Sequence, residues 1–264
     1  MVSPVYDPQV FNSLAIVLKC VDYGDHDRIL TLFTREKGKL SALAKNAKKS
    51  VKRFSGALEL FYVIDLAIRQ NSRMAYLMEA SVVEAFENIR WDILKIAYAS
   101  YWVETVVRFL EEGTCQEGIF NLLYHCLAGL NAGLRSPDEW SIYYHLKFLE
   151  MTGHAPELSR CLICGSDLDH MEGVRVGFDI AAGGLTCDRC RRFDRSMGLA
   201  KGTVKQLLWF QHSNPENASV IRFSPYAIEE GLNFLESFLT HHLENELRSL
   251  KFLRKTRERH SHLS

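Results

Sequence analysis

The hydrophobic periodicity changes between residues 82 and 88, and this change constrains the fold more than any other feature. Before it, apolar and β-branched residues fall at period two, as in residues 28–34, which is typical of strands. From Asn88 onward, apolar residues recur at three- and four-residue steps, which is typical of amphipathic helices. The sequence therefore predicts an α+β protein with a β domain at residues 1–82 and a helical domain at residues 83–264.

Five strands are expected in the first domain. Their predicted ranges are 14–20, 28–34, 40–45, 57–69 and 74–82. Five short strands with one long basic connection favour a small Greek-key barrel of the OB type. Such barrels bind single-stranded nucleic acids with a charged groove and stacking aromatic side chains. Phe54, Phe61 and Tyr62 are candidates for stacking, but burial in the core is the favoured interpretation in so small a barrel.

Positive charge is concentrated between Arg35 and Arg53. Overall the chain is balanced, with 32 Lys and Arg against 32 Asp and Glu, so this charge is a local feature. Within the segment, Glu36 is the single acid. Two interpretations stay open, a surface for polyanions and a solvated loop. The basic residues are Arg35, Lys37, Lys39, Lys45, Lys48, Lys49, Lys52 and Arg53.

Four of the seven cysteines form two C-x-x-C pairs, Cys161 with Cys164 and Cys187 with Cys190. Two such knuckles can enclose one tetrahedral zinc ion, and four thiolates leave it no open coordination position. The pattern therefore predicts a structural zinc ion in a zinc-ribbon-like insertion at about residues 160–195. A redox C-x-x-C or unligated thiols are the alternatives. The other cysteines, Cys20, Cys115 and Cys126, are expected in the core.

Helices are expected around this insertion. Their predicted ranges are 91–109, 119–130, 196–212 and 224–255, together with one helix that begins after Ser136. Trp91 is placed on the buried face of the first, and Ser136-Pro137 with Glu139 is a capping box. Basic residues near the knuckles and in the last helix are possible secondary DNA contacts, although those in the helix also complement its dipole. They are Arg191, Arg192, Arg254, Lys255 and Arg257.

Several function classes have no support in the sequence. There is no phosphate-binding G-x-x-x-x-G-K-[ST], no G-x-G-x-x-G, and no metalloprotease or hydrolase motif. His145, His241 and His242 have no matching acid or cysteine cluster, so structural roles are expected. A signal peptide and a membrane span are not expected either, and the cysteine usage suits a reducing cytosol. An enzyme is not expected.

Two segments carry a resemblance to a known family. Residues 15–40 contain A-I-V-L-K and D-Y-G-D-H-D-R-I-L-T-L-F-T-R-E-K-G-K-L, and residues 45–61 contain K-N-A-K-K and R-F-S-G-A-L-E-L-F. With the order of β domain, helical domain, cysteine insertion and basic last helix, they resemble the RecO family of bacterial DNA repair proteins. Asn46 stands where the family often has Gly, and Leu60 where Pro is common. Asn tolerates the same turn geometry.

The resemblance implies a non-enzymatic recombination mediator in the bacterial cytoplasm, associated with the nucleoid. It implies an OB fold that binds single- and double-stranded DNA and anneals complementary strands without nucleotide hydrolysis. The implied partners are RecR, the acidic C-terminal tail of single-stranded DNA-binding protein (SSB) and, functionally, RecA. Zinc is implied to stabilise the fold. The eight basic residues of the segment from Arg35 to Arg53 are predicted to contact DNA phosphates.

Two other functions stay open. One is a zinc-stabilised helical scaffold that docks partner proteins, with the basic segment merely solvated. The other is an OB-fold RNA-binding factor, which would prefer structured RNA to single-stranded DNA.

Overall fold

The computed structural model describes residues 9–54, 56–71, 74–190, 196–213 and 223–261. Its contacts divide the chain into two compact units, Met1–Ala132 and Gly133–Ser264. The proposed domain boundary between residues 82 and 83 falls inside the first unit, close to the end of its last strand. Each unit is described below by itself.

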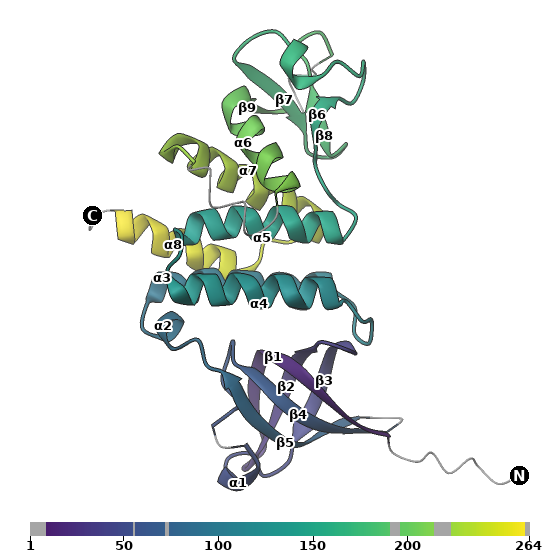
Figure 1. The fold of residues 1–264 in the computed structure, drawn as a ribbon, viewed down its shortest axis with the longest axis vertical. Helices are drawn as coiled ribbons and strands as arrows, with labels where there is room; N and C mark the ends of the chain where they lie inside the picture. Colours follow the sequence, from purple (N-terminus) through teal and green to yellow (C-terminus); the bar gives the residue numbers. More distant parts are fainter. Residues whose placement is uncertain (1–8, 55, 72–73, 191–195, 214–222, 262–264) are drawn as a thin grey trace, which may run out of the picture. The chain divides into compact units, whose positions relative to one another are not determined.

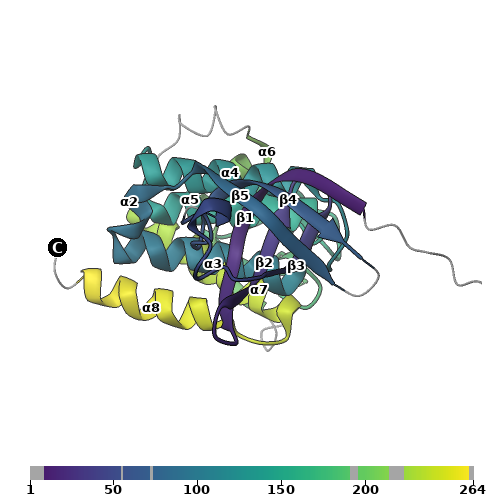
Figure 2. The ribbon, with the colours of Figure 1, turned by 90° about the horizontal axis from the view of Figure 1, so that it is seen from below.

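The first unit contains a closed five-stranded barrel, as the sequence predicts (Figure 1; seen from below in Figure 2). The strands pair in the order β1-β2-β3-β5-β4, and β3 and β5 are parallel whereas the other four pairs are antiparallel. This order and the single parallel pair fit an OB-type barrel. The strands are β1 (Gln9–Tyr23), β2 (Asp27–Thr34), β3 (Gly38–Ala44), β4 (Val63–Gln70) and β5 (Ala75–Glu84).

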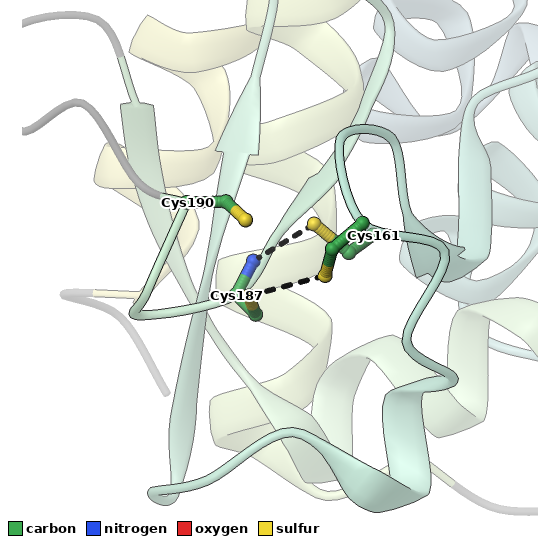
Figure 3. A group of neighbouring side chains, drawn as sticks. Cys161, Cys187 and Cys190 are labelled. Carbon is green, nitrogen blue, oxygen red and sulfur yellow. Dashed lines mark hydrogen bonds between the residues drawn. The ribbon is translucent and has the colours of Figure 1, made fainter.

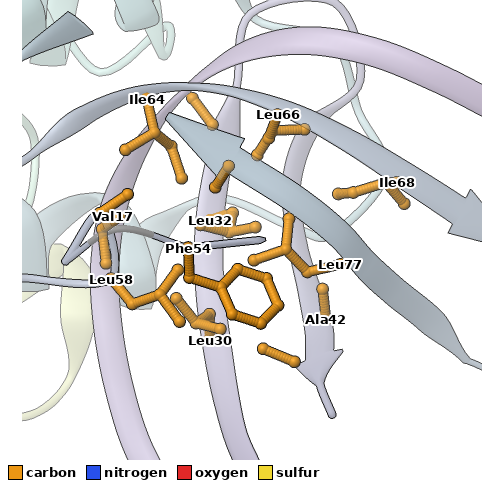
Figure 4. Packing of buried hydrophobic residues seen from close by; sticks show 14 of the residues in the cluster. Val17, Leu30, Leu32, Ala42, Phe54, Leu58, Ile64, Leu66, Ile68 and Leu77 are labelled. Carbon is orange, nitrogen blue, oxygen red and sulfur yellow. The ribbon is translucent and has the colours of Figure 1, made fainter. Parts of the chain in front are cut away.

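A short helix, α1 (Val51–Phe54), supplies Phe54 to the barrel core (Figure 4). Phe54 is 2% exposed and packs among inward-facing residues of the strands, including Leu30 and Leu77. Phe61 and Tyr62 are buried as well. The favoured interpretation of these three aromatics as core residues is therefore confirmed, and none of them is available to stack on a base.

The strand predicted at residues 57–69 begins only at Val63. Ala57 and Leu58 are buried in the barrel core as loop residues, which explains their apolar character without a strand. Phe61 has a φ of 71°, which a strand does not accommodate, and its N–H donates to the carbonyl of Val17 at 3.0 Å. The apolar pattern of this segment reflects a buried loop.

Three helices complete the first unit, and α1 lies at the other end of the barrel from α3 and α4 (Figure 1). Asp92 caps α3 through its side chain, so Trp91 precedes the helix and is 89% exposed. The expectation that Trp91 is buried is wrong. Cys115 is exposed in the connection after α3, so its placement in the core is wrong too, whereas Cys126 is buried. The helices are α2 (Glu87–Arg90), α3 (Ile93–Phe109) and α4 (Glu117–Ala132).

The second unit combines helices with a four-stranded sheet in the order β6-β8-β7-β9. The predicted capping box is confirmed, because Ser136 and Glu139 each accept a hydrogen bond from the other's backbone at the start of α5. The elements are α5 (Pro137–Met151), β6 (Glu157–Cys161), the 3-10 helix η1 (Leu168–His170), β7 (Arg175–Asp179), β8 (Gly184–Thr186), β9 (Ser196–Ala200), α6 (Lys201–His212), α7 (Pro225–Leu243) and α8 (Arg248–Ser261).

Two predicted helices of this unit differ from the structure. Residues 196–200 form β9, which pairs with β7, and the helix starts only at Lys201. The helix predicted at 224–255 is two helices, because Glu244 ends α7 with a φ of 58° and α8 begins at Arg248. Apolar spacing continues through the break, because both helices bury one face.

Structural roles for the histidines agree with the described contacts. His145 is buried in α5, and its ring Nδ1 lies 2.7 Å from the carbonyl oxygen of Ser141. Burial lowers the pKa of His145 to about 3, so the ring is neutral at physiological pH. His242 packs its ring edge-on against Phe238. Within the described ranges, no helix combines the length and the apolar character that crossing a membrane requires.

Candidate nucleic-acid interface and metal centre

The β2–β3 hairpin carries three of the eight predicted cations, and the connection between α3 and α4 covers part of it. The Lys39 amine donates to the carbonyl of Val107 at 2.7 Å, and the Arg35 guanidinium is 2.7 Å from the Glu117 carboxylate. Burial lowers the pKa of Lys39. Arg35 and Lys39 are therefore engaged inside the first unit, whereas Lys37 is exposed at the hairpin.

Gly38 allows this close packing. A Cβ atom at this position would lie 1.9 Å from the carbonyl oxygen of Thr114, and the residue has a φ of 70°. Both features require glycine. Gly38 thus allows the connection between α3 and α4 to cover this face of the hairpin, so the face is not an exposed strand surface.

The loop between β3 and β4 carries the other five cations and is held by the turn between β1 and β2. The Asp27 carboxylate accepts from the N–H of Asn46 at 2.8 Å, and the N–H of Lys48 donates to the carbonyl of His26 at 3.1 Å. Asn46 has a φ of 54°, which agrees with its standing at a turn position where glycine is common. We call residues 45–53 the basic loop.

The cations of the basic loop differ in their partners. Lys48 pairs with Asp22 at 3.0 Å, and Arg53 donates from Nε to the Ser50 hydroxyl at 2.9 Å. No ion pair within the described residues involves Lys45, Lys49 or Lys52, all of which are exposed. These last three are the side chains best placed to meet an anionic ligand.

Three residues near the basic loop were missed by sequence reasoning. Arg28 pairs with Asp22 at 3.3 Å, beside Lys48, and so adds a cation to this region. Tyr23 is 56% exposed at the end of β1, and Tyr76 lies under the Lys45 amine at 5.2 Å from its ring centroid. Arg28 and Tyr23 flank the β1–β2 turn that holds the loop, and this neighbourhood could not be read from the sequence.

The proposed secondary DNA contacts divide in the same way. Arg254 and Arg257 both donate to the carboxylate of Glu236, which is 2% exposed. Lys255 is exposed on α8. Arg191 and Arg192 lie outside the described residues.

The four cysteines converge at one point, as Figure 3 shows for Cys161, Cys187 and Cys190. Their sulfur atoms all lie within 4.8 Å of one another, with Cys161 at the end of β6 and Cys187 directly after β8. The sulfurs of Cys164 and Cys187 are 3.7 Å apart. A tetrahedral ion with metal–sulfur bonds of about 2.3 Å requires sulfur–sulfur distances of about 3.8 Å. The group can therefore hold a metal ion.

Backbone hydrogen bonds shape the first knuckle and favour thiolates. Gly165, with a φ of 72°, donates its N–H to the carbonyl of Cys161 at 2.9 Å, and the N–H of Cys187 points at the Cys161 sulfur at 3.4 Å. Burial raises the pKa of Cys161, but the N–H groups of Cys164 and Cys187 outweigh it and lower the pKa to about 6.

The opposite shift appears at Cys190. Two causes raise the pKa of Cys190 to about 12: the larger is the hydrogen bond with the Cys187 side chain, and the second is burial. Thiolates at this spacing repel one another, so they cannot all ionise without a compensating charge. A bound divalent cation supplies that charge and deprotonates its thiol ligands. The donor set thus fits a metal ion better than four free thiols.

Comparison with known proteins places both halves of the chain in one family. Residues 9–86 match the model described as "Recombination protein O N terminal", and residues 90–251 match "Recombination protein O C terminal". Together these matches cover the barrel, the helices α3 to α7 and the cysteine cluster.

Similar proteins are named DNA repair protein RecO. One from Desulfatibacillum aliphaticivorans is 40% identical over 250 residues, covering 93% of this chain and 97% of that protein. One from Desulfosudis oleivorans is 38% identical over 255 residues, covering 94% and 98%. One from Geobacter metallireducens is 34% identical over 241 residues, covering 91% and 96%.

Proposed function

The chain belongs to the RecO family of DNA repair proteins, and on this premise we propose that it is a non-enzymatic recombination mediator. The family supports a role in recombinational DNA repair. In the proposed activity the barrel binds single- and double-stranded DNA, and the protein anneals complementary strands without nucleotide hydrolysis. It acts with RecR, binds the acidic C-terminal tail of SSB, and helps to load RecA on SSB-coated DNA.

The observation that carries this proposal is the basic loop. Three exposed lysines, Lys45, Lys49 and Lys52, lie on a loop that the β1–β2 turn anchors. An anchored loop loses little conformational entropy on binding, so little of the binding free energy from its charges is spent on ordering the loop. Tyr23, which is 56% exposed nearby, supplies a face on which an unpaired base can stack.

Annealing follows from charge neutralisation on this surface. Two complementary strands repel each other through their phosphates, and cations that bind both backbones reduce this repulsion. Contacts to phosphate hold the backbones and leave the base edges open, so pairing between strands can proceed. No step of this process needs a nucleotide site or a metal-bound water.

We propose zinc as the ion at Cys161, Cys164, Cys187 and Cys190. Four thiolates in a tetrahedral arrangement are the usual donor set of structural zinc, and they leave no position for a substrate. The ion would stabilise the two knuckles, which follow β6 and β8. The residues around the ion would bind no substrate. In the proposed function the ion therefore has a structural role only.

The first prediction concerns the three exposed lysines. Replacing Lys45, Lys49 and Lys52 together by Gln should weaken binding to a single-stranded oligonucleotide severalfold or more at low salt. The slope of log K against log salt should become less negative by about 2, because each lost single-strand phosphate contact removes about 0.7 from its magnitude. Fluorescence anisotropy titrations at four salt concentrations measure both quantities.

A matched control variant loses the same number of positive charges in the second unit. Lys205, Lys251 and Arg259 are exposed in the second unit, and their triple replacement by Gln should leave the affinity and slope unchanged. If the two triple variants lost affinity equally, only the total charge of the protein would matter. If neither lost affinity, the assignment of the basic loop to DNA would be wrong.

Annealing separates the proposed function from its alternatives. The full chain should accelerate pairing of two complementary oligonucleotides, one of them coated with SSB, in the absence of nucleotide. A scaffold protein would neither shift an oligonucleotide nor accelerate pairing. An RNA-binding factor would bind a structured RNA more tightly than single-stranded DNA of equal length.

A further inference from the structure

An open groove of about 340 Å³ lies on the outer surface of the barrel beside the basic loop. Its floor is formed by the middle of β4 and β5, and α1 contributes two basic residues of the basic loop to its lining. The groove is therefore continuous with the proposed DNA-binding surface. Its polar lining residues are Asn12, Lys52, Arg53, Asp65, Glu79 and Ser81.

The strand register places the two carboxylates on one face. Ala67 pairs with Glu79, and Asp65 pairs with Ser81, in the antiparallel ladder of β4 and β5. Asp65 and Glu79 are thus diagonal neighbours, about 7–8 Å apart between their backbones. Ala67 has a short side chain between them, so the floor of the groove stays open.

A β-bulge aims Glu79 into the groove. Leu77 faces the barrel core at 2% exposure, and strict alternation would turn Glu79 inward as well. The ladder instead skips Met78, because Ile68 pairs with Leu77 while Ala67 pairs with Glu79. The extra residue reverses the phase of the strand and places Glu79 outside. Bulges are used in this way beside binding sites to re-aim a side chain.

The charges of the groove favour a ligand that has both an anionic group and hydrogen-bond donors. Asp65 and Glu79 take part in no ion pair within the described ranges, although Lys52 and Arg53 line the same groove. The carboxylates repel phosphate and accept hydrogen bonds, whereas the cations attract phosphate. A nucleotide unit of a single strand meets both demands, with its phosphate on the cations and its base edge toward the carboxylates.

We propose that this groove binds one unpaired base of a DNA strand held by the basic loop, and that it prefers guanine. The inference rests on the proposed single-strand binding. On its Watson–Crick edge guanine offers two adjacent donors, N1–H and the N2 amino group, which one carboxylate accepts together. Cytosine and adenine offer one amino group there. Thymine offers N3–H between two carbonyl oxygens, which carboxylates repel. A paired guanine has no free Watson–Crick edge, so duplex DNA gains nothing.

The test compares oligonucleotides with the full chain. A thymine 12-mer with one central guanine should bind about tenfold more tightly than the all-thymine 12-mer, as expected for one bidentate contact between side chain and base. Replacing that guanine by inosine, which lacks the N2 amino group, should remove most of the gain. Equal affinity for the guanine and thymine strands would overturn the inference.

Substitutions assign the preference to the groove. The double variant Asp65→Asn with Glu79→Gln should bind all strands alike, with affinity for the all-thymine strand equal to or above that of the native chain. Glu87→Gln removes an exposed carboxylate outside the groove and should keep the guanine preference. A preference that survived in the double variant would overturn the inference.

The two proposals fail in different ways. If the native chain bound no oligonucleotide, the proposed function would fail. If it bound the all-thymine strand but did not distinguish guanine, only the groove assignment would fail. The inosine comparison needs no variant, so misfolding of a substituted chain cannot obscure the result.

Discussion

Removing the proposed zinc ion from the four cysteines is expected to unfold the strands around them while leaving the barrel intact. The β6–β8 pairing is short, with Glu157 opposite Gly184 and Cys161 opposite Leu185. So few backbone contacts cannot hold two knuckles by themselves. In small zinc-binding domains, ion binding contributes roughly 10–16 kcal/mol of apparent folding free energy, so its loss should open this region.

The other half of the sheet, which contains β7 and β9, is held by buried aromatic side chains. Phe178 of β7 packs edge-on against Phe234 and Phe238 of α7, with ring centroids 4.6 and 5.4 Å apart. We therefore expect β7 and β9 to keep part of their protection when the ion is removed. The opening should be concentrated at residues 157–168 and 184–190.

Hydrogen exchange before and after treatment with a strong chelator measures this effect. Amides of β6 and β8 should exchange orders of magnitude faster without the ion, while those of β1–β5 should not change. Metal analysis of the purified chain should give about one zinc ion for each chain. Cys161→Ser should reproduce the effect of chelation, whereas Cys115→Ser, at an exposed thiol outside the cluster, should not. A metal-free chain with full protection at β6 and β8 would contradict the prediction.

The elements that the sequence predicted well are those for which local chemistry is decisive. The spacing of the two C-x-x-C pairs predicted that the four cysteines meet at one metal site, and they do lie together. Ser136 with Glu139 identifies the start of a helix without any tertiary information. The alternation in residues 28–34 reflects a strand in a closed barrel. In each case one short segment contains the whole physical reason.

The failures share a different cause, which is that long-range contacts decide the outcome. An apolar run at 57–62 is compatible with a strand or with a buried loop, and only the barrel interior selects the loop. The basic residues looked equivalent, but contacts about 70 to 80 residues away engage Lys39 and Arg35. The bulge at Met78 depends on pairing with β4, so the position of Glu79 could not be read from β5 alone.

Glu236 illustrates the same limit and gives the second large prediction. It lies in α7 and is 2% exposed, and its carboxylate accepts hydrogen bonds from Arg254 at 2.8 Å and from Arg257. In one continuous helix a residue 18 positions away would be about 27 Å distant. The break at Glu244 therefore allows α8 to fold back, and the ion pairs hold it against α7.

Glu236→Ala should destabilise the second unit by about 1.5–3 kcal/mol, because Arg254 and Arg257 lose the buried carboxylate that both contact, although Arg254 keeps Glu246 at 2.6 Å. Exchange of α7 and α8 amides under native conditions should report this loss directly. The control is Lys251→Ala, which removes an exposed partner of Glu246 and should cost less than about 1 kcal/mol. A cost for Glu236→Ala as small as the control would contradict a structural role for these ion pairs.

A double-mutant cycle then decides what the basic end of α8 does. Arg257→Met alone should destabilise the second unit, because the carboxylate of Glu236 loses one donor. Combining it with Glu236→Leu should cost much less than the two single changes together, since the partners are removed as a pair. If Arg257 bound DNA, Arg257→Met would lower DNA affinity, even in the double variant. If it only holds α8, affinity should stay unchanged while the stabilities show strong coupling. The geometry favours the second outcome, because Arg257 donates to a carboxylate that solvent scarcely reaches.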